Sequence, residues 1–222
     1  MRAQEFVTEY ERDTSSSKQI FAKLQQLGYT KLGDGQDATV WSKDEGTVIK
    51  ILMPSDLKAD YADKNFLTFY NFCQQHTDLP NLPKFIDVGG AHHTAFEIDG
   101  RPYRQIAMER LQPIKNGTFE EAMVWILSDL AATRAPWKVV VEKLLDAKEW
   151  NADGSGIMSR MPELIRAKLN DERFNAEYNM LLLTMQMLYM AGQKASLGWD
   201  LHTENVMQRR DGTLVIVDPY FT

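Results

Sequence analysis

Residues 30–52, "TKLGDGQDATVWSKDEGTVIKIL", contain the pattern that decides the fold. The apolar pair Val40–Trp41 and the apolar residues of 48–52 predict two β-strands, and "KDEG" predicts the turn between them. Gly33 and Gly35 stand in a G-x-G spacing just before the first strand. Glycines at this spacing let backbone N–H groups approach phosphate oxygens with no side chain in the way. A simple hairpin turn is the alternative explanation of the two glycines.

The residues that follow the glycines separate several kinds of phosphate-binding loop. A dinucleotide-binding loop opens a helix and a Walker-type loop continues into G-K-[ST], whereas this loop leads into a strand. A glycine loop between two strands, with a lysine in the next strand, is the arrangement of a kinase phosphate cover. Lys50 holds that place, and we expect its side chain on the face opposite Ile49 and Ile51. The alternative for Lys50 is a solvated edge lysine.

A second group of polar residues lies near the end of the chain, in "GWDLHTENV" (198–206) and at Asp218. An aspartate such as Asp200 can accept the proton of a hydroxyl group. The amide oxygen of Asn205 and the carboxylate of Asp218 are ligands that suit Mg²⁺. Each residue alone could be a turn residue, a cap or a strand end. Their joint occurrence after the glycine loop and Lys50 favours a phosphate and metal site.

The remaining segments predict an α+β fold in three parts. Helices are expected after the serines of "DTSSSK", over residues 55–77, and through most of 118–197 with breaks at "RAPW" and "NADGSG". Hairpins are expected in "TAFEIDGRPYRQIAMERL" and in "NVMQRRDGTLVIVDPYFT". These elements predict an N-terminal helical segment (1–28), a strand-rich lobe with one helix (29–111) and a mostly helical lobe (112–222).

The composition excludes several classes of protein. Hydrophobic residues make up 44% and charged residues 25% of the 222 positions, which is typical of a soluble globular protein. The 25 basic and 31 acidic residues give a net charge of −6, which argues against a nucleic-acid partner. Cys73 is the only cysteine, so the chain forms no internal disulfide and no thiolate zinc site. No apolar leader or membrane span is evident, and we expect a cytoplasmic protein without a membrane partner.

Five stretches in a fixed order resemble the motifs of the protein-kinase-like superfamily. They are "LGDGQDATV", "TVIKIL", "IAMERL", "WDLHTEN" and "VIVDPY". They match the glycine-rich loop, strand lysine, hinge, catalytic loop and metal-binding Asp motif of that superfamily over about residues 29–220. "GWDLHTENVM" is also similar to the loop of aminoglycoside and choline phosphotransferases. The whole set looks most like the early protein kinases of tailed phages, which have a similar "LG-x-G" opening and terminal "DP" pair.

The resemblance implies ATP and Mg²⁺ as cofactors and gives each motif residue a role. Asp200 would be the catalytic base, with His202 near the γ-phosphate, and Asn205 and Asp218 would hold Mg²⁺. The residues it implies for nucleotide binding are Gly33, Gly35, Ala38 and Val40 at the phosphate cover, Lys50 at the α- and β-phosphates, Met108 as gatekeeper, and the backbone of Glu109 and Leu111 at adenine.

Two departures from the superfamily pattern stand out. The helix expected over 55–77 contains no glutamate to pair with Lys50, and among its aspartates we select Asp63 as the partner. The sequence ends at Thr222, soon after Asp218, so we expect a two-lobed kinase-like fold truncated after the metal-binding Asp motif. Such a fold would have no activation segment and no later C-lobe helices.

The expected function is therefore an ATP- and Mg²⁺-dependent phosphotransferase. The resemblance to phage enzymes favours a compact Ser/Thr protein kinase, acting on a host protein in the host cytoplasm if a phage encodes it. One alternative is a small-molecule kinase of the aminoglycoside or choline type. The other is a pseudokinase, which binds a nucleotide or a host protein without catalysis.

Overall fold

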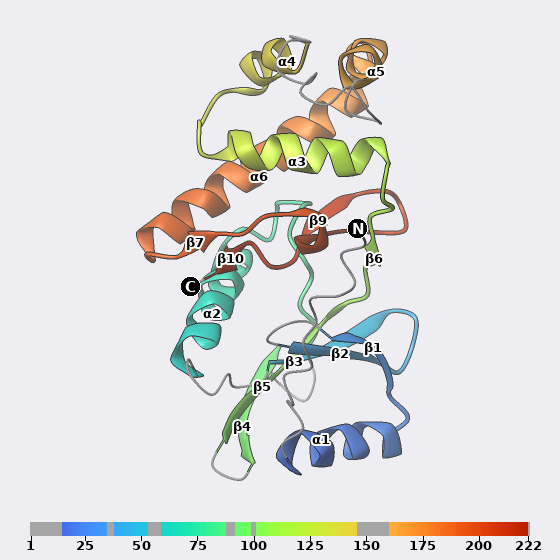
Figure 1. The fold of residues 1–222 in the computed structure, drawn as a ribbon, viewed down its shortest axis with the longest axis vertical. Helices are drawn as coiled ribbons and strands as arrows, with labels where there is room; N and C mark the ends of the chain where they lie inside the picture. Colours follow the sequence, from blue (N-terminus) through green and yellow to red (C-terminus); the bar gives the residue numbers. More distant parts are fainter. Residues whose placement is uncertain are drawn as a thin grey trace, which may run out of the picture. The chain divides into compact units, whose positions relative to one another are not determined.

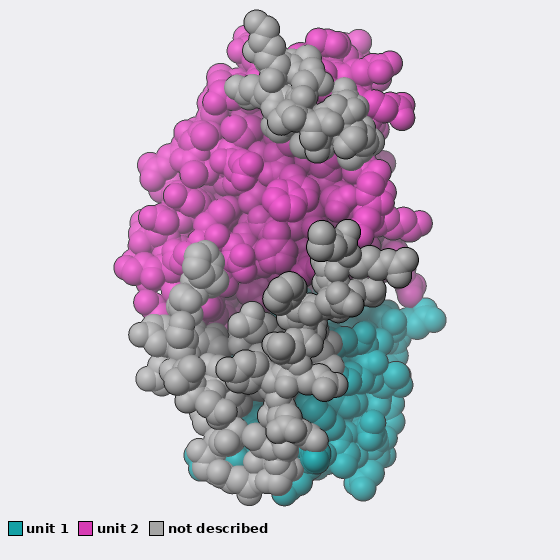
Figure 2. Space-filling view, viewed as in Figure 1, with its two compact units in different colours: residues 1–59, 85–110 teal, residues 60–84, 111–222 magenta. Residues whose placement is uncertain are grey.

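The computed structural model of the chain describes residues 15–34, 38–52, 59–87, 92–98, 101–145 and 160–221. The chain divides into two compact units (Figure 2). Unit 1 comprises residues 1–59 and 85–110, and unit 2 comprises residues 60–84 and 111–222. Unit 1 is built on an antiparallel sheet and unit 2 is mostly helical, which confirms the α+β fold class.

Unit 1 contains a five-stranded antiparallel sheet with the strand order β1-β2-β3-β5-β4 (Figure 1). Its strands are β1 (Thr30–Asp34), β2 (Ala38–Ser42), β3 (Thr47–Leu52), β4 (His93–Ile98) and β5 (Arg101–Glu109). The expected "KDEG" turn joins β2 to β3, and the Asp44 carboxylate accepts hydrogen bonds from the N–H groups of Gly46 (2.8 Å) and Thr47 (2.7 Å). An Asp side chain commonly closes a turn in this way.

One face of this sheet is covered by the first helix, α1 (Ser15–Gln26). The helix contributes two buried residues, Ile20 and Leu24, which are spaced four apart on one face. They form one apolar cluster with Trp41, Ile49, Ile51 and Tyr103 of the sheet. The expected N-terminal helical segment over residues 1–28 packs, in its described part, against the strands of unit 1.

Unit 2 is organised around its longest helix, α6 (Glu172–Lys194). The Asp171 side chain caps α6 by accepting hydrogen bonds from the N–H groups of Arg173 (2.9 Å) and Phe174 (3.3 Å). The other helices are α2 (Ala59–Gln75), α3 (Phe119–Ala131), α4 (Trp137–Leu145) and α5 (Met161–Lys168). The expected break at "RAPW" is confirmed between α3 and α4. In the described part of the chain, no helix is both long and apolar enough to cross a membrane.

Short strands and one turn of 3₁₀ helix complete unit 2. They are β6 (Gln112–Pro113), β7 (Gly198–Trp199), η2 (Thr203–Asn205), β8 (Val206–Gln208), β9 (Leu214–Ile216) and β10 (Tyr220–Phe221). The hairpin expected after residue 205 is confirmed as β8–β9. The pairing of β7 with β10 and of β6 with β8 was not expected, because two-residue strands leave no periodic pattern in a sequence.

Residues 60–84 belong to unit 2, whereas we expected residues 29–111 to form one lobe. The loop after α2 is hydrogen-bonded to the β8–β9 hairpin, which explains the difference. Arg209 donates through Nη1 to the Pro80 carbonyl (2.5 Å) and through Nη2 to the Leu82 carbonyl (2.8 Å). Asn81 lies between them. Its side-chain Nδ2 donates to the Leu214 carbonyl (2.8 Å), and its backbone carbonyl accepts from the Ile216 N–H (2.9 Å).

The packing of α6 against the C-terminal strand gives a stability prediction. A Cβ added at Gly192 would lie 2.7 Å from a ring carbon of Tyr220. We expect Gly192→Ala to lower the midpoint of thermal unfolding. Overpacking destabilises a protein by about 1–3 kcal/mol, whereas the better helix propensity of Ala stabilises it by at most about 1 kcal/mol. In a Tyr220→Leu background the same substitution should cost less. An equal cost in both backgrounds would contradict the packing explanation.

Candidate active site

The polar residues of 200–205 lie beside the segment that carries Asp218. The Asp200 N–H donates to the Pro219 carbonyl (2.9 Å), next to the β7–β10 pairing of Trp199 with Tyr220. The Val217 N–H donates to the Asn205 carbonyl (2.9 Å). Unit 2 therefore brings Asp200 and Asn205 to the segment on either side of Asp218.

The Asn205 side chain fixes the shape of the loop. Its Nδ2 donates to the Asp200 carbonyl (2.6 Å), and its backbone N–H donates to the His202 carbonyl (3.0 Å). This hydrogen bond distinguishes Nδ2 from Oδ1 of the Asn205 amide, because the Asp200 carbonyl is an acceptor and must be bonded to the nitrogen. Among the described residues, the hydrogen bonds of the Asn205 side chain are made by Nδ2, and its Oδ1 could accept a further donor or a cation.

His202 lies close to the side chains of Asp200 and Asn205. Its Nε2 lies 3.9 Å from Oδ2 of Asp200 and 3.1 Å from Nδ2 of Asn205, while its Nδ1 lies 3.3 Å from the Glu204 N–H nitrogen. A neutral imidazole has one acceptor nitrogen, so only one of the two N–H contacts is a hydrogen bond in a given tautomer. Either tautomer holds the ring beside the Asp200 carboxylate, whose side chain is 47% exposed.

The residues that could hold a metal ion are Asn205 and Asp218, an amide and a carboxylate on adjoining segments. In the described residues, no group of three or more His, Cys, Asp or Glu side chains is placed to hold a metal. Mg²⁺ is commonly held by one or two protein oxygens and completes its shell with water and phosphate oxygens.

The residue after Pro219 anchors the Asp218 segment to the helices of unit 2. The Tyr220 hydroxyl donates to the Leu188 carbonyl of α6 (2.8 Å), and its ring meets Phe69 of α2 edge-on with 6.5 Å between centroids. Burial raises the pKa of the Tyr220 hydroxyl above its ordinary value, and the nearby Cys73 adds to the shift. Sequence analysis assigned no role to Tyr220, because a single aromatic residue near a chain end carries no pattern.

In unit 1, four of the predicted nucleotide-binding residues lie on one face of the sheet. Strand register pairs Val40 with Lys50 and Ala38 with Leu52, and pairs Met108 with Val48. Directly paired residues share a face, and residues two apart along a strand do also. Ala38, Val40, Lys50 and Met108 thus lie opposite the face that packs on α1, as predicted for Lys50 from Ile49 and Ile51.

The structure gives less information on the remaining residues predicted to bind the nucleotide. Gly33 pairs with Val40 next to a β-bulge in β1, and no atom of the described residues lies within 4 Å of a Cβ built on it. Glu109 ends β5 opposite Thr47, and Leu111 is a buried residue of unit 2. Gly35 and the side chain of Asp63 lie outside the described residues. The pairing of Lys50 with Asp63 therefore stays a prediction.

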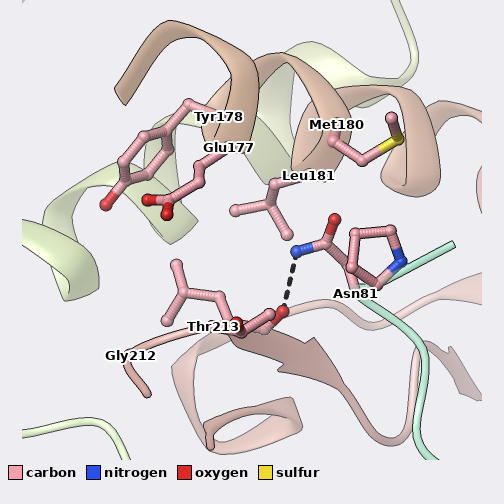
Figure 3. A pocket seen from close by; sticks show the side chains of 9 residues that line it. Asn81, Glu177, Tyr178, Met180, Leu181, Gly212 and Thr213 are labelled. Carbon is pink, nitrogen blue, oxygen red and sulfur yellow. Dashed lines mark hydrogen bonds between the residues drawn. The ribbon is translucent and has the colours of Figure 1, made fainter. Parts of the chain in front are cut away.

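Unit 2 also contains a cavity of about 110 Å³ that involves none of the predicted site residues. It is lined by Pro80, Asn81, Glu177, Tyr178, Met180, Leu181, Gly212, Thr213 and Leu214 (Figure 3). Figure 3 shows the Asn81 amide at its edge, with Nδ2 bonded to the strand that begins at Leu214. The cavity thus lies at the junction of α6, the loop after α2 and the β8–β9 turn.

Comparisons with known proteins gave matches among solved structures alone. No protein-family model matches the chain, and no curated protein matches it. A MAP kinase from Leishmania major is 14% identical with a TM-score of 0.37, and 91% of this chain covers 50% of that one. An aminoglycoside phosphotransferase from Alicyclobacillus acidocaldarius is 13% identical with a TM-score of 0.38, for 86% of this chain and 62% of that one.

A third similar structure is the amicoumacin kinase hAmiN, in complex with AMP-PNP and Ca²⁺. It is 11% identical with a TM-score of 0.43, and 92% of this chain covers 64% of it. The chain thus spans from about half to just under two thirds of the length of these three structures. The similar structures include both protein kinases and small-molecule phosphotransferases.

The buried hydroxyl of Tyr220 predicts how stability depends on pH. Its raised pKa means that the folded state favours the neutral phenol, so this contribution is present below the ordinary tyrosine pKa of about 10 and is lost as the pH rises above it. Tyr220→Phe should cost about 1 kcal/mol at pH 7, for the lost hydrogen bond to Leu188. Between pH 7 and 11 the free energy of unfolding, measured with denaturant, should decrease less in Tyr220→Phe than in the wild type. An equal decrease in both proteins would contradict this prediction.

Proposed function

We propose that this chain is an ATP- and Mg²⁺-dependent phosphotransferase. The observation that carries the proposal is the arrangement of Asp200, Asn205 and the Asp218 segment in unit 2. One loop and one strand end, distant in sequence, are hydrogen-bonded so that a candidate base and two oxygen ligands come from adjoining segments. A turn, a cap and a strand end with unrelated roles would not need these mutual bonds.

In the proposed reaction, the acceptor hydroxyl oxygen forms a bond to the γ-phosphorus of ATP as the bond to the β,γ-bridging oxygen breaks. Asp200 accepts the hydroxyl proton, and ADP leaves. Mg²⁺, when bound, would neutralise charge on the phosphate oxygens. Asn205 and Asp218 would hold it through Oδ1 and the carboxylate. His202, beside Asp200, orients the acceptor or stabilises charge on the transferred group.

The roles proposed for unit 1 are those that the resemblance to the protein-kinase-like superfamily implies, and the shared sheet face of Ala38, Val40, Lys50 and Met108 supports them. Lys50 contacts the α- and β-phosphates, and the Gly33–Gly35 loop covers them. The remaining proposed contacts are Ala38, Val40 and Met108 on the same face, the backbone of Glu109 and Leu111 for adenine, and Asp63 as the partner of Lys50.

We favour a protein substrate, because the motif set resembles the early kinases of tailed phages. Under this proposal the enzyme works in the cytoplasm, on a host protein if a phage encodes it, and without nucleic-acid or membrane partners. His202 supports the second candidate, a small-molecule kinase, because the D-x-H-x-x-N loop resembles that of aminoglycoside and choline phosphotransferases. A pseudokinase would bind nucleotide without turnover.

A transfer assay tests the catalytic proposal. The protein is incubated with γ-labelled ATP and Mg²⁺, in one arm with bacterial lysate and in the other with a panel of aminoglycosides and choline. We expect label on an acceptor, and we expect Asp200→Asn to reduce the transfer rate at least about 100-fold, because general-base catalysis contributes about 10²–10⁴. Glu204→Gln, an exposed change in the same loop, is the matched control and should keep the rate.

The pattern of label separates the candidates. Label on proteins supports a protein kinase, and label on a small molecule supports the second candidate. A nucleotide-induced rise in thermal stability without transfer indicates a pseudokinase. The proposal as a whole is wrong if the protein shows neither transfer nor an Mg²⁺-dependent shift with ATP.

Gly33 gives a separate test of nucleotide binding. No described residue would contact a methyl group at this position, so we expect Gly33→Ala to change the free energy of unfolding by no more than about 0.5 kcal/mol. If backbone N–H groups of this loop cover the phosphates, the added methyl group should weaken ATP binding in calorimetric titration. Gly46→Ala, in the β2–β3 turn, is the matched control and should bind like the wild type. Equal ATP affinity in all three proteins would show that the glycine loop does not bind the phosphates.

A further inference from the structure

The structure contains a buried hydroxyl, on a helix outside every motif, that is bonded to both neighbours of Asp200. Ser128 lies on α3 and is 6% exposed. Its Oγ donates to the Leu201 carbonyl (2.6 Å) and accepts from Nε1 of Trp199 (3.2 Å). One side chain thus links the residue before Asp200 to the residue after it.

Three hydrogen bonds hold the backbone around Asp200. The Asp200 N–H is bonded to the Pro219 carbonyl, and the Asp200 carbonyl is bonded to Nδ2 of Asn205. The next carbonyl along the chain, that of Leu201, is the one bonded to Ser128. Of these three anchors, Ser128 alone comes from outside the loop and the C-terminal strand segment.

The Asp200 carboxylate itself is held weakly. Its side chain is 47% exposed, and its one ionic contact within the described residues is with His202 at 3.9 Å. The position of this carboxylate is therefore set by the backbone that carries it. A displacement of about 1 Å in a catalytic group can cost about 100-fold in rate, so the anchors of the backbone matter for catalysis.

We propose that Ser128 is a positioning residue, which acts through Trp199 and Leu201 to hold the Asp200 carboxylate in its reactive place. The proposal rests on the proposed phosphotransferase function. It assigns to α3 a role in catalysis as well as packing. Loss of the hydroxyl would leave both the Leu201 carbonyl and the Trp199 N–H without this partner, and the loop would move to find others.

The competing explanation is that Ser128 only contributes to the stability of unit 2. The two explanations differ in what a conservative replacement does and in which kinetic constant changes. Thr184 of α6 provides a matched control, because it too is fully buried and its hydroxyl donates to a backbone carbonyl, that of Met180 (2.9 Å). It makes no hydrogen bond to the loop of Asp200.

The experiment compares Ser128→Ala, Ser128→Thr, Trp199→Phe and Thr184→Val in the same transfer assay, at a temperature where all four variants are folded. We expect Ser128→Ala to lower kcat at least about tenfold with the KM for ATP within about twofold of the wild type. Ser128→Thr, which keeps the hydroxyl, should restore most of kcat. Trp199→Phe should have a smaller effect in the same direction, and Thr184→Val should leave kcat unchanged at a comparable loss of stability.

Backbone amide hydrogen exchange gives a readout that does not depend on activity. Ser128→Ala should raise exchange at residues 200–202, whereas Thr184→Val should not. An active wild type whose kcat and loop exchange are both unaffected by Ser128→Ala would overturn the positioning role and leave the proposed function intact. A wild type without transfer would overturn the proposed function, and the exchange data would still decide whether Ser128 orders the loop. Equal loss of kcat in Ser128→Ala and Ser128→Thr would also overturn the proposal.

Discussion

The hydrogen bond from the Asp200 N–H to the Pro219 carbonyl joins the two segments that contain the proposed catalytic and metal-binding residues. It lies next to the pairing of β7 with β10, and Asn205 extends the connection by bonding to both Asp200 and Val217. A loop of polar residues would otherwise have several conformations of similar free energy. Here the backbone groups of Asp200 and Asn205 have partners in the loop and in the segment around Asp218, which favours one conformation.

Burial of the neighbouring apolar and aromatic groups keeps this connection in place. Tyr220 directs its hydroxyl to the Leu188 carbonyl and its ring to Phe69, and α6 has a glycine at residue 192 where that ring approaches it. On the other side of the loop, Ser128 links it to α3. The polar loop thus rests on α3 and α6, the two longest helices that lie wholly within unit 2.

The pattern of apolar runs and turn residues predicted the hairpins of both units. The strands around Lys50, the hairpin that ends at Glu109 and the hairpin after Asn205 were all expected, because alternating or continuous apolar runs with turn residues between them leave a clear pattern. The common face of Val40 and Lys50 followed from the two-residue repeat of a strand.

The parts that could not be predicted depend on single long-range contacts. No local pattern marks Arg209, which bonds the β8–β9 hairpin to the loop after α2 and helps to place residues 60–84 in unit 2. Ser128 is one small polar residue in an apolar helix, and its partners are more than 70 positions away. Two-residue strands such as β7 and β10 exist only through their pairing.

The central proposal is that Asp200, Asn205 and Asp218 of unit 2 act on one metal–nucleotide complex. It is tested most directly by recording amide spectra of the protein while paramagnetic Mn²⁺ replaces Mg²⁺ in the presence of a non-hydrolysable ATP analogue. The account predicts line broadening at Asp200, Asn205 and Asp218, dependent on the nucleotide and reversed by excess Mg²⁺. No broadening at these residues, or equal broadening with and without nucleotide, would contradict it.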